Sequence, residues 1–212
     1  MNIKDMRESY EKDILDVNHL EETPFAQFAK WFNEVKDSNV PEPNAMILST
    51  VDARCRPSSR TVLLKEMEED GFVFYTNYQS DKAKDLAVND NVALIFLWKE
   101  LQRQVRITGK AIKVPREQSE SYFHERPKGS QIGAWASPQS RVIPDREILE
   151  KKVEELENEY ENDDVLPLPD HWGGYKVLPE TVEFWQGRPN RLHDRLRFEK
   201  QNGSWKIERL AP

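Results

Sequence analysis

The strongest constraint on the fold is a series of short β-type runs joined by links too short for crossover helices. Between residues 45 and 114, five runs are rich in β-branched and aromatic residues, at 45–51, 60–64, 71–76, 92–98 and 104–114. Links of this kind join antiparallel neighbours. An antiparallel meander removes its exposed edge strands when it closes into a barrel, so a barrel is the expected arrangement. One predicted helix, 80–89 with Ser80 as its N-cap, interrupts the series.

The last third of the chain returns to the β pattern. Three further strands are predicted, at 174–177, 181–186 and 195–200. Asn202-Gly203 predicts a tight turn into a final strand at 205–209. The chain is therefore mainly β, with α elements at the periphery.

Three helices are predicted outside this β framework. Thr23 and Pro24 are residue types preferred at a helix N-cap and first position. The apolar stripe of the helix that they open is Phe25, Phe28, Ala29, Phe32 and Val35. A second helix runs from Pro115 to about residue 125, and a third follows Pro144-Asp145 with Leu149, Val153, Leu156 and Tyr160 on one face. Residues 1–22 are expected to form a mobile arm, and 23–212 a single domain.

Composition restricts the possible partners. A net charge of −7 over 212 residues argues against general nucleic-acid binding, so an anion site must be a local cluster of basic residues. No apolar run approaches the roughly 18 residues that a membrane span needs, and the polar N-terminus does not resemble a signal peptide. The single cysteine, Cys55, is typical of the cytoplasm. No metal site is expected, because no His or Cys pair has ligand spacing.

The segment 184–195 gathers such a basic cluster. Arg188, Arg191, Arg195 and His193 lie within a few residues of Trp185, and a turn is predicted at 188–194 between two strands. Guanidinium groups bind phosphates and electron-rich ring edges in a planar, bidentate manner, and an indole offers a flat stacking surface. The residues alone are equally compatible with a basic surface hairpin.

Several short sequence motifs add to this pattern. The motifs are Trp185-Gln-Gly, Arg191-Leu-His-Asp-Arg195, Ser130-Gln-Ile-Gly-Ala-Trp135, Trp172-Gly-Gly-Tyr175 and the C-terminal Trp205-Lys-Ile-Glu-Arg-Leu-Ala-Pro. With these, the chain resembles the pyridoxine/pyridoxamine 5'-phosphate oxidases, FMN enzymes of vitamin B6 metabolism. The resemblance implies an FMN-binding split β-barrel with helices packed outside. It also implies a homodimer, with FMN across the subunit interface and residues 170–212 contributing to the active site and the dimer.

The implied reaction converts pyridoxamine 5'-phosphate or pyridoxine 5'-phosphate to pyridoxal 5'-phosphate. A hydride passes from the C4' carbon to the flavin, and O2 then reoxidises the flavin and yields H2O2. Two alternatives remain open. One is a related split-barrel flavin oxidase that acts on another ring system, such as the phenazine-pathway members, and the other is a non-catalytic FMN or pyridoxal-phosphate binding protein.

The resemblance also assigns the FMN contacts. They are Arg60, Thr61, Val62, Leu63, Leu64, Lys65, Tyr75, Thr76, Lys82, Gln104, Gln139, Ser140, Trp185 and Arg195. Arg60 and Lys82 are implied at the FMN phosphate. Without the resemblance, 60–65 reads as a strand with solvated ends, and Ser80 to Lys82 as an ordinary helix N-terminus, which also favours an anion. Asp81 stands where the family commonly has arginine, and we expect its carboxylate to face outward toward Lys84 or Lys82.

The implied substrate contacts form two groups. Tyr122 and Arg126 are four residues apart on one helical face and precede Ser130, a possible N-cap of the next helix. With Lys65, these three would hold the substrate's phosphate, although a capped helix-turn-helix explains them as well. Arg191 and His193 are the implied catalytic residues beside the oxidised carbon, with Arg7 and Tyr10 as a lid. The arm has the sequence Arg-Glu-Ser-Tyr where the family usually has Arg-x-Glu-Tyr, a difference that concerns only the lid.

Overall fold

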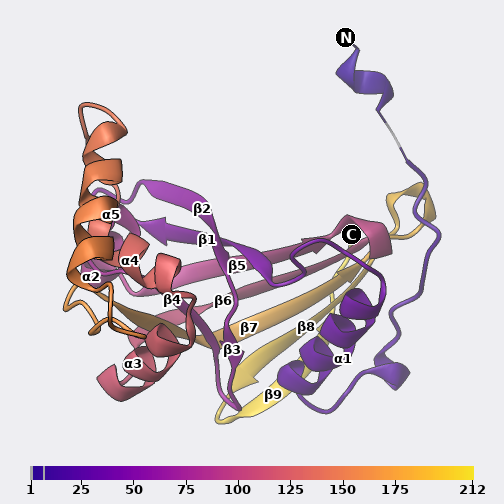
Figure 1. The fold of residues 1–212 in the computed structure, drawn as a ribbon. Helices are drawn as coiled ribbons and strands as arrows, with labels where there is room; N and C mark the ends of the chain where they lie inside the picture. Colours follow the sequence, from indigo (N-terminus) through magenta and orange to yellow (C-terminus); the bar gives the residue numbers. More distant parts are fainter. Residues whose placement is uncertain (1, 7) are drawn as a thin grey trace.

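The computed structural model describes residues 2–6 and 8–212, and its centre is one antiparallel sheet that curls into an open barrel. The strands are β1 (Ala45–Val51), β2 (Pro57–Leu63), β3 (Glu66–Met67), β4 (Phe72–Asn77), β5 (Asn91–Trp98), β6 (Arg103–Lys113), β7 (Trp172–Gln186), β8 (Asp194–Gln201) and β9 (Ser204–Arg209). Their order is β2-β1-β5-β6-β7-β4-β3, and β8 and β9 extend from β7 (Figure 1). This antiparallel arrangement confirms the predicted fold class.

The barrel is split where β2 passes into β3. The Lys65 N–H donates to the Val73 carbonyl, so the chain crosses at this point from the β1 edge of the sheet to the β4 edge. No strand pairing closes the two edges among the described residues. Lys65 is exposed at this opening, whereas the neighbouring Leu64 is buried.

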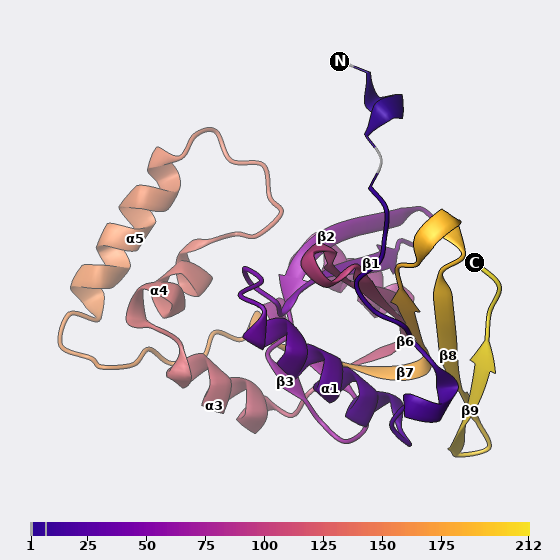
Figure 2. The ribbon, with the colours of Figure 1, turned by 90° about the vertical axis from the view of Figure 1, so that its right-hand side faces the viewer.

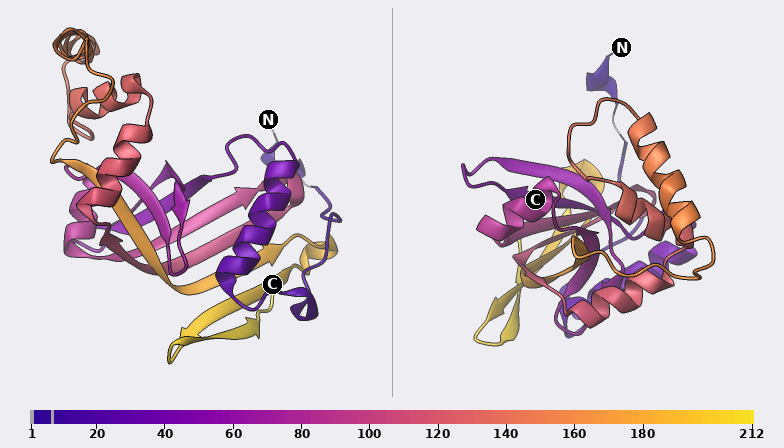
Figure 3. Two further views of the ribbon diagram at one scale, coloured as in Figure 1. Left: turned by 60° about the horizontal axis from the view of Figure 1, so that its bottom comes forward. Right: turned by 60° about the vertical axis from the view of Figure 1, so that its left-hand side comes forward.

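The helices cover the barrel in two groups. They are α1 (Pro24–Asp37), α2 (Asp81–Val88), α3 (Arg116–Glu125), α4 (Lys128–Ala136) and α5 (Glu147–Glu159), with short 3-10 turns at Ile3–Asp5, Val17–His19, Lys99–Leu101 and Pro189–Arg191. α1 lies across the barrel, and α3, α4 and α5 form a separate layer beside it (Figures 2 and 3). None of the helices in the described ranges is long and apolar enough to cross a membrane.

Two apolar cores match these groups. The main core fills the barrel and contacts α1, and its largest fully buried side chains include Phe28, Phe72, Phe96 and Trp98. The second core joins α3, α4 and α5 through residues such as Phe123, Ile132 and Leu156. Burying aromatic side chains of this size is a main source of stability in such domains.

The N-cap prediction at Thr23 is confirmed, because its Oγ1 accepts the Ala26 N–H at 3.1 Å. The predicted stripe of α1 is only partly right. Trp31 and Gln27 are buried, whereas Phe25 and Phe32 lie at the margin of the core. The arm before α1 makes contacts along the barrel from Ser9 to Leu15, and its mobility and the domain boundary at residue 22 stay predictions.

Two predicted strands form one. The runs at 174–177 and 181–186 are both part of β7, because the break at Pro179 is absorbed by a bulge opposite β6. Thr108 pairs with Thr181 and Gly109 with Pro179, so one residue of β7, Glu180, has no partner. The prediction that Ser80 is the N-cap of α2 is confirmed by its position, although its side chain makes no capping hydrogen bond. The prediction for Ser130 was wrong, because Ser130 lies inside α4, whose N-cap is Pro127.

The bulge requires glycine at position 109. A Cβ there would lie 2.1 Å from the Leu178 carbonyl oxygen, which belongs to the backbone and cannot move aside. We expect Gly109→Ala to lower the free energy of unfolding by about 1–3 kcal/mol or more, as overpacking does. Gly129→Ala is the matched control, because a Cβ in α4 meets no atom within 4 Å. Urea unfolding should show that control unchanged or stabilised by up to about 1 kcal/mol, and equal effects of both variants would contradict this account.

Candidate active site

Most of the predicted phosphate-handling residues surround one cavity of about 490 Å³, here called the basic pocket. Twelve of the predicted site residues line it: Arg60, Thr61, Val62, Leu63, Lys65, Tyr75, Thr76, Lys82, Tyr122, Arg126, Ser130 and Gln139. Its other lining residues are Asn77, Pro127 and Trp172, so four cations face a cavity to which no carboxylate contributes. The volume is within the range of small-molecule sites.

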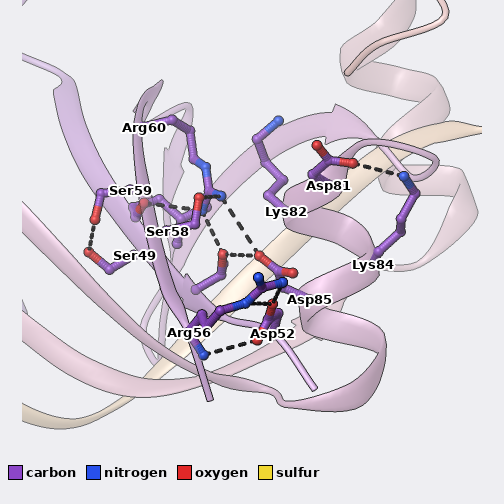
Figure 4. A network of polar contacts seen from close by, with 12 residues as sticks. Ser49, Asp52, Arg56, Ser58, Ser59, Arg60, Asp81, Lys82, Lys84 and Asp85 are labelled. Atoms are coloured by element: carbon purple, nitrogen blue, oxygen red, sulfur yellow. Dashed lines mark hydrogen bonds and ion pairs between the residues drawn. The ribbon is translucent and has the colours of Figure 1, made fainter. Parts of the chain in front are cut away.

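Arg60 and Lys82 approach the pocket from β2 and α2 (Figure 4). The Arg60 guanidinium donates to Thr50 Oγ1 at 2.7 Å and to Ser58 Oγ at 2.8 Å, and Asp85 lies 3.8 Å away. Lys82 Nζ donates to Gln139 Oε1 at 2.8 Å. Burial, and next the charge of Arg60, lowers the pKa of Lys82. Both cations are thus held mainly by neutral partners, which leaves their charge available to an anion.

Asp81 does not compete for these cations. Its carboxylate is exposed and accepts from Lys84 Nζ at 2.8 Å, the contact drawn as a dashed line in Figure 4. This confirms the expected outward orientation. The hydrogen bond from Lys84 holds the pKa of the exposed Asp81 below its ordinary value. The departure from arginine at this position therefore places no carboxylate in the pocket.

A stack of aromatic rings forms one wall of the basic pocket. The Tyr75 ring lies 4.1 Å from that of Tyr122 and 5.4 Å from that of Trp172, with interplanar angles of 20° and 8°. The Tyr75 hydroxyl donates to Glu66, and burial and this bond raise its pKa well above 10. Trp172 was not predicted as a site residue, although it is the first residue of the motif Trp172-Gly-Gly-Tyr175. A stack of this kind fixes the orientation of the Tyr122 ring.

Arg126 packs over this stack. Its guanidinium lies 4.8 Å from the Trp172 ring, and burial lowers its pKa. Its Nη1 is buried and has no hydrogen-bond partner among the described residues, and the same holds for Ser80 Oγ. Buried donors without partners are costly, and an anion in the basic pocket would remove that cost at Arg126.

A second cavity, of about 500 Å³, is here called the loop pocket. It is lined by Met6, Glu8, Ser9, Tyr10, Trp185, Arg188, Asn190, Arg191 and His193. The predicted turn between β7 and β8 is confirmed, and it contains two left-handed residues, Asn190 with φ 57° and Arg191 with φ 64°. Such backbone conformations are unfavourable for an arginine and concentrate at functional sites.

His193 is held in one tautomer. Its Nδ1 accepts the Arg188 N–H at 3.1 Å, so the neutral ring carries its proton on Nε2. The ring lies 4.5 Å from Trp185 and 5.8 Å from Tyr10. Burial, followed by the charge of Arg191, lowers the pKa of His193 below 6.5. At neutral pH the imidazole is therefore an uncharged hydrogen-bond donor.

Gln104, Trp185 and Arg195 form a row across β6, β7 and β8. The register pairs Trp185 with Gln104 on one side and with Arg195 on the other, so the three side chains project from the same face of the sheet. Arg195 Nε donates to Glu183 at 2.8 Å, which raises the pKa of Arg195. The row lies at the loop-pocket end of the sheet.

Comparison with known proteins agrees with this geometry. The family model described as "Pyridoxamine 5'-phosphate oxidase" matches residues 32–160. The model described as "Pyridoxine 5'-phosphate oxidase C-terminal dimerisation region" matches residues 172–212. The chain belongs to the pyridoxamine 5'-phosphate oxidase family.

Relatives named pyridoxine/pyridoxamine 5'-phosphate oxidase match the whole chain. The one from Salinibacter ruber is 51% identical over 212 residues and covers 99% of both chains. The one from Acaryochloris marina is 49% identical over 211 residues and covers 100% of this chain and 96% of its own.

Solved structures support the same fold. PhzG from Burkholderia lata 383, crystallised with tetrahydrophenazine-1-carboxylic acid, has a TM-score of 0.89 at 28% identity, covering 94% of this chain and 98% of its own. An FMN-binding protein from Nostoc punctiforme has a TM-score of 0.71 at 18% identity, covering 91% and 100%, and supports the fold alone.

Four of the predicted site residues line neither pocket: Leu64, Gln104, Ser140 and Arg195. Gln104 and Arg195 belong to the row across β6, β7 and β8. Leu64 packs in the core, and its backbone N–H and C=O are bonded to Asn44. Ser140 is exposed and does not line either pocket. Arg7 lies outside the described residues.

The two pockets lie at opposite ends of strand β7. Trp172, at the start of β7, lines the basic pocket, and Trp185, near its end, lines the loop pocket. At the rise of an extended strand, thirteen residues correspond to roughly 40 Å. One chain alone therefore does not bring Arg191 and His193 to the basic pocket.

The unpartnered guanidinium of Arg126 leads to a stability prediction. Arg126→Met should leave the free energy of unfolding unchanged or higher, because a buried polar group without a partner is replaced by an apolar chain. Arg103→Met is the control, because the more deeply buried Arg103 is hydrogen-bonded through Nε, Nη1 and Nη2; it should lose about 1.5–3 kcal/mol. Urea unfolding without added phosphate compounds measures both, and a large loss in Arg126→Met would refute the assignment.

The environment of His193 leads to a second prediction. An NMR titration should give His193 a pKa below 6.5, and Arg191→Ala should raise this pKa without restoring 6.5, because burial is the larger cause. A folded-state pKa below the unfolded value means that His193 contributes stability above pH 6.5 and loses it as the pH falls through the folded pKa. A pKa at or above 6.5 in the unaltered protein would show that the ring is not desolvated.

Proposed function

We propose that this protein is an FMN-dependent oxidase that converts pyridoxine 5'-phosphate or pyridoxamine 5'-phosphate to pyridoxal 5'-phosphate. The observation that carries the proposal is the basic pocket, where four cations and a buried donor without a partner converge in a chain of net charge −7. Such a pocket suits ligands with phosphate groups. Membership of the family and the full-length relatives support the same activity.

The residues present fit FMN. Arg60 and Lys82 would hold its phosphate near the buried Ser80 hydroxyl, and Gln104, Trp185 and Arg195 would contact its ring. The redox chemistry, removal of a hydride from C4' and delivery of the electrons to O2 with release of H2O2, is supplied by FMN when it is bound. The chain's own task is to bind and orient two phosphate-bearing molecules.

Arg126, Tyr122, Ser130 and Lys65 would bind the substrate phosphate. Arg126 supplies a desolvated guanidinium, and the aromatic stack holds the Tyr122 ring in a fixed plane. Lys65, at the split of the barrel, lines the same cavity. This clamp favours a phosphorylated substrate over an unphosphorylated ring such as the one bound by PhzG.

Arg191 and His193 would act at the carbon that is oxidised. A guanidinium stays protonated, so Arg191 stabilises negative charge rather than removing a proton. His193 presents its Nε2–H as a donor, because Nδ1 is engaged by the Arg188 N–H. Tyr10 packs against His193 and would limit the access of water.

The complete site would need two subunits. The separation of the basic pocket from the loop pocket supports this arrangement, as does the match of residues 172–212 to a dimerisation region. The sheet face beside Gln104 also carries exposed apolar residues, including Ile47 and Leu97, which a second copy would cover. A cytoplasmic location and a role in B6 biosynthesis complete the proposal, the location supported by the lone thiol of Cys55.

The decisive experiment is an anaerobic titration of the FMN-loaded protein with pyridoxine 5'-phosphate, monitored by visible flavin absorption. Bleaching that air reverses would demonstrate both halves of the oxidase cycle. An unchanged spectrum with this substrate and with the amine would favour a binding protein or another ring substrate. Failure to bind FMN would overturn the proposal.

Steady-state kinetics should separate the two groups of substrate residues. Arg126→Met should raise KM about tenfold or more with kcat nearly kept, because it removes uniform binding of the phosphate. Arg191→Ala and His193→Ala should lower kcat as well, because they remove contacts near the reacting carbon. Equal KM effects in all three variants with kcat intact would refute this division.

A further inference from the structure

Arg103, at the start of β6, contacts three other parts of the chain. Its side chain is only 6% exposed, and its guanidinium lies 4.5 Å from the Trp31 ring. Nε donates to Gln186 Oε1 at 2.9 Å, Nη1 to the Glu34 carboxylate and Nη2 to Asp13 Oδ2 at 2.6 Å. The arginine thus links β7 and α1 to the N-terminal arm.

The neighbouring residue binds the backbone of the arm. Gln102 has φ 54°, a left-handed conformation at the turn before β6. Its Oε1 accepts the N–H groups of Glu11 and Lys12 at 2.9 and 3.1 Å. The carbonyl of Asp13 accepts from Arg188 Nη1 at 3.1 Å, so the arm is also tied to the loop that follows β7. Residues 11–13 are therefore held on both sides.

Tyr10 directly precedes residues 11–13. Its ring lies 5.9 Å from Trp185 in an edge-on contact and 5.8 Å from His193. The packing is close on the other side as well, because a Cβ at Gly187 would lie 2.8 Å from Tyr10 Cδ2. The position of Tyr10 relative to His193 thus depends on where residues 11–13 are held.

We propose that Asp13 and Arg103 are positioning residues for the oxidation, acting through Tyr10. The buried Arg103 is the fixed anchor, and Asp13 is the group that attaches the arm to it. Neither residue lines the basic pocket or the loop pocket, so neither is placed to touch the substrate. This inference rests on the proposed function, in which Tyr10 packs against His193 and limits the access of water.

Asp13 can be tested without damage to the fold. Its side chain is 53% exposed, and without it Arg103 keeps its bonds to Glu34 and Gln186. Asp13→Ala should raise KM for pyridoxine 5'-phosphate about threefold to tenfold, as the loss of a charge-assisted hydrogen bond does. Its kcat should change less than twofold. Its free energy of unfolding should fall by less than that of Arg103→Met, because Arg103 keeps two of its three side-chain partners.

Glu22→Ala is the matched control. It removes the same charge from the same arm, and Glu22 is exposed and forms no hydrogen bond or ion pair with the other residues that the structure describes. Its KM should equal that of the unaltered holoenzyme. An equal rise in KM in both variants would attribute the effect to net charge and overturn the proposal.

A double-mutant cycle tests whether Asp13 acts through Tyr10. Tyr10→Ala should raise KM, and adding Asp13→Ala to it should raise KM no further, because the residue being positioned is gone. Independent effects that multiply would show that Asp13 acts by another route and would contradict the inference.

Hydrogen exchange of the Glu11 and Lys12 amides gives a readout that does not depend on activity. Their exchange should be faster in Asp13→Ala than in Glu22→Ala and the unaltered holoenzyme. If the protein is an active oxidase, unchanged exchange and unchanged KM in Asp13→Ala would overturn the proposed role of Asp13 and Arg103 and leave the proposed function intact. Faster exchange in a protein without oxidase activity would support the anchor, and the role in oxidation would fail with the proposed function.

Discussion

Strand β7 connects every part of this molecule that bears on function. It pairs with β6 along most of its length, with β4 at its start and with β8 at its end. Its first residue, Trp172, supports the basic pocket, and Trp185 supports the loop pocket. The strand stays continuous through Pro179 because Gly109 allows its backbone to approach closely at the bulge. The spacing of the two half-sites is therefore a property of one ladder of hydrogen bonds.

The partners of the buried and half-buried cations distinguish the cations that can bind an anion from those that stabilise the fold. Lys82 and Arg126 are desolvated and meet neutral groups or aromatic rings, so their charge is available to a phosphate. Arg103 and Arg195 are bonded to carboxylates and are neutralised within the fold. Arg60 is intermediate, with hydroxyl partners close by and Asp85 at 3.8 Å. In an acidic protein, this choice of partners decides where an anion can bind.

The arm belongs to the loop-pocket end of the molecule. Asp13 reaches the buried Arg103, and the Leu15 N–H donates to Asp194 at the start of β8. These contacts bring a segment from the beginning of the chain beside His193, near its end. The surroundings of Arg191 and His193, the proposed catalytic pair, are thus built from three sequence regions, the arm, the start of β6 and the β7–β8 turn.

The sequence by itself determined the antiparallel β class, most strand positions, the Thr23 cap and the family, together with the residues that the family resemblance implies for phosphate binding. These follow from the spacing of apolar residues, the residue types at turns and short sequence motifs, all of which are properties of neighbouring residues. Only the tertiary structure decided that 174–177 and 181–186 form one strand, that Ser130 lies inside α4, and that Trp172 stacks beneath Arg126. It also decided that the predicted site divides between two ends of the sheet. The physical reason is that burial and bonding partners, such as Asp13, Glu34 and Gln186 around Arg103, come from residues far apart in the chain and leave no local pattern.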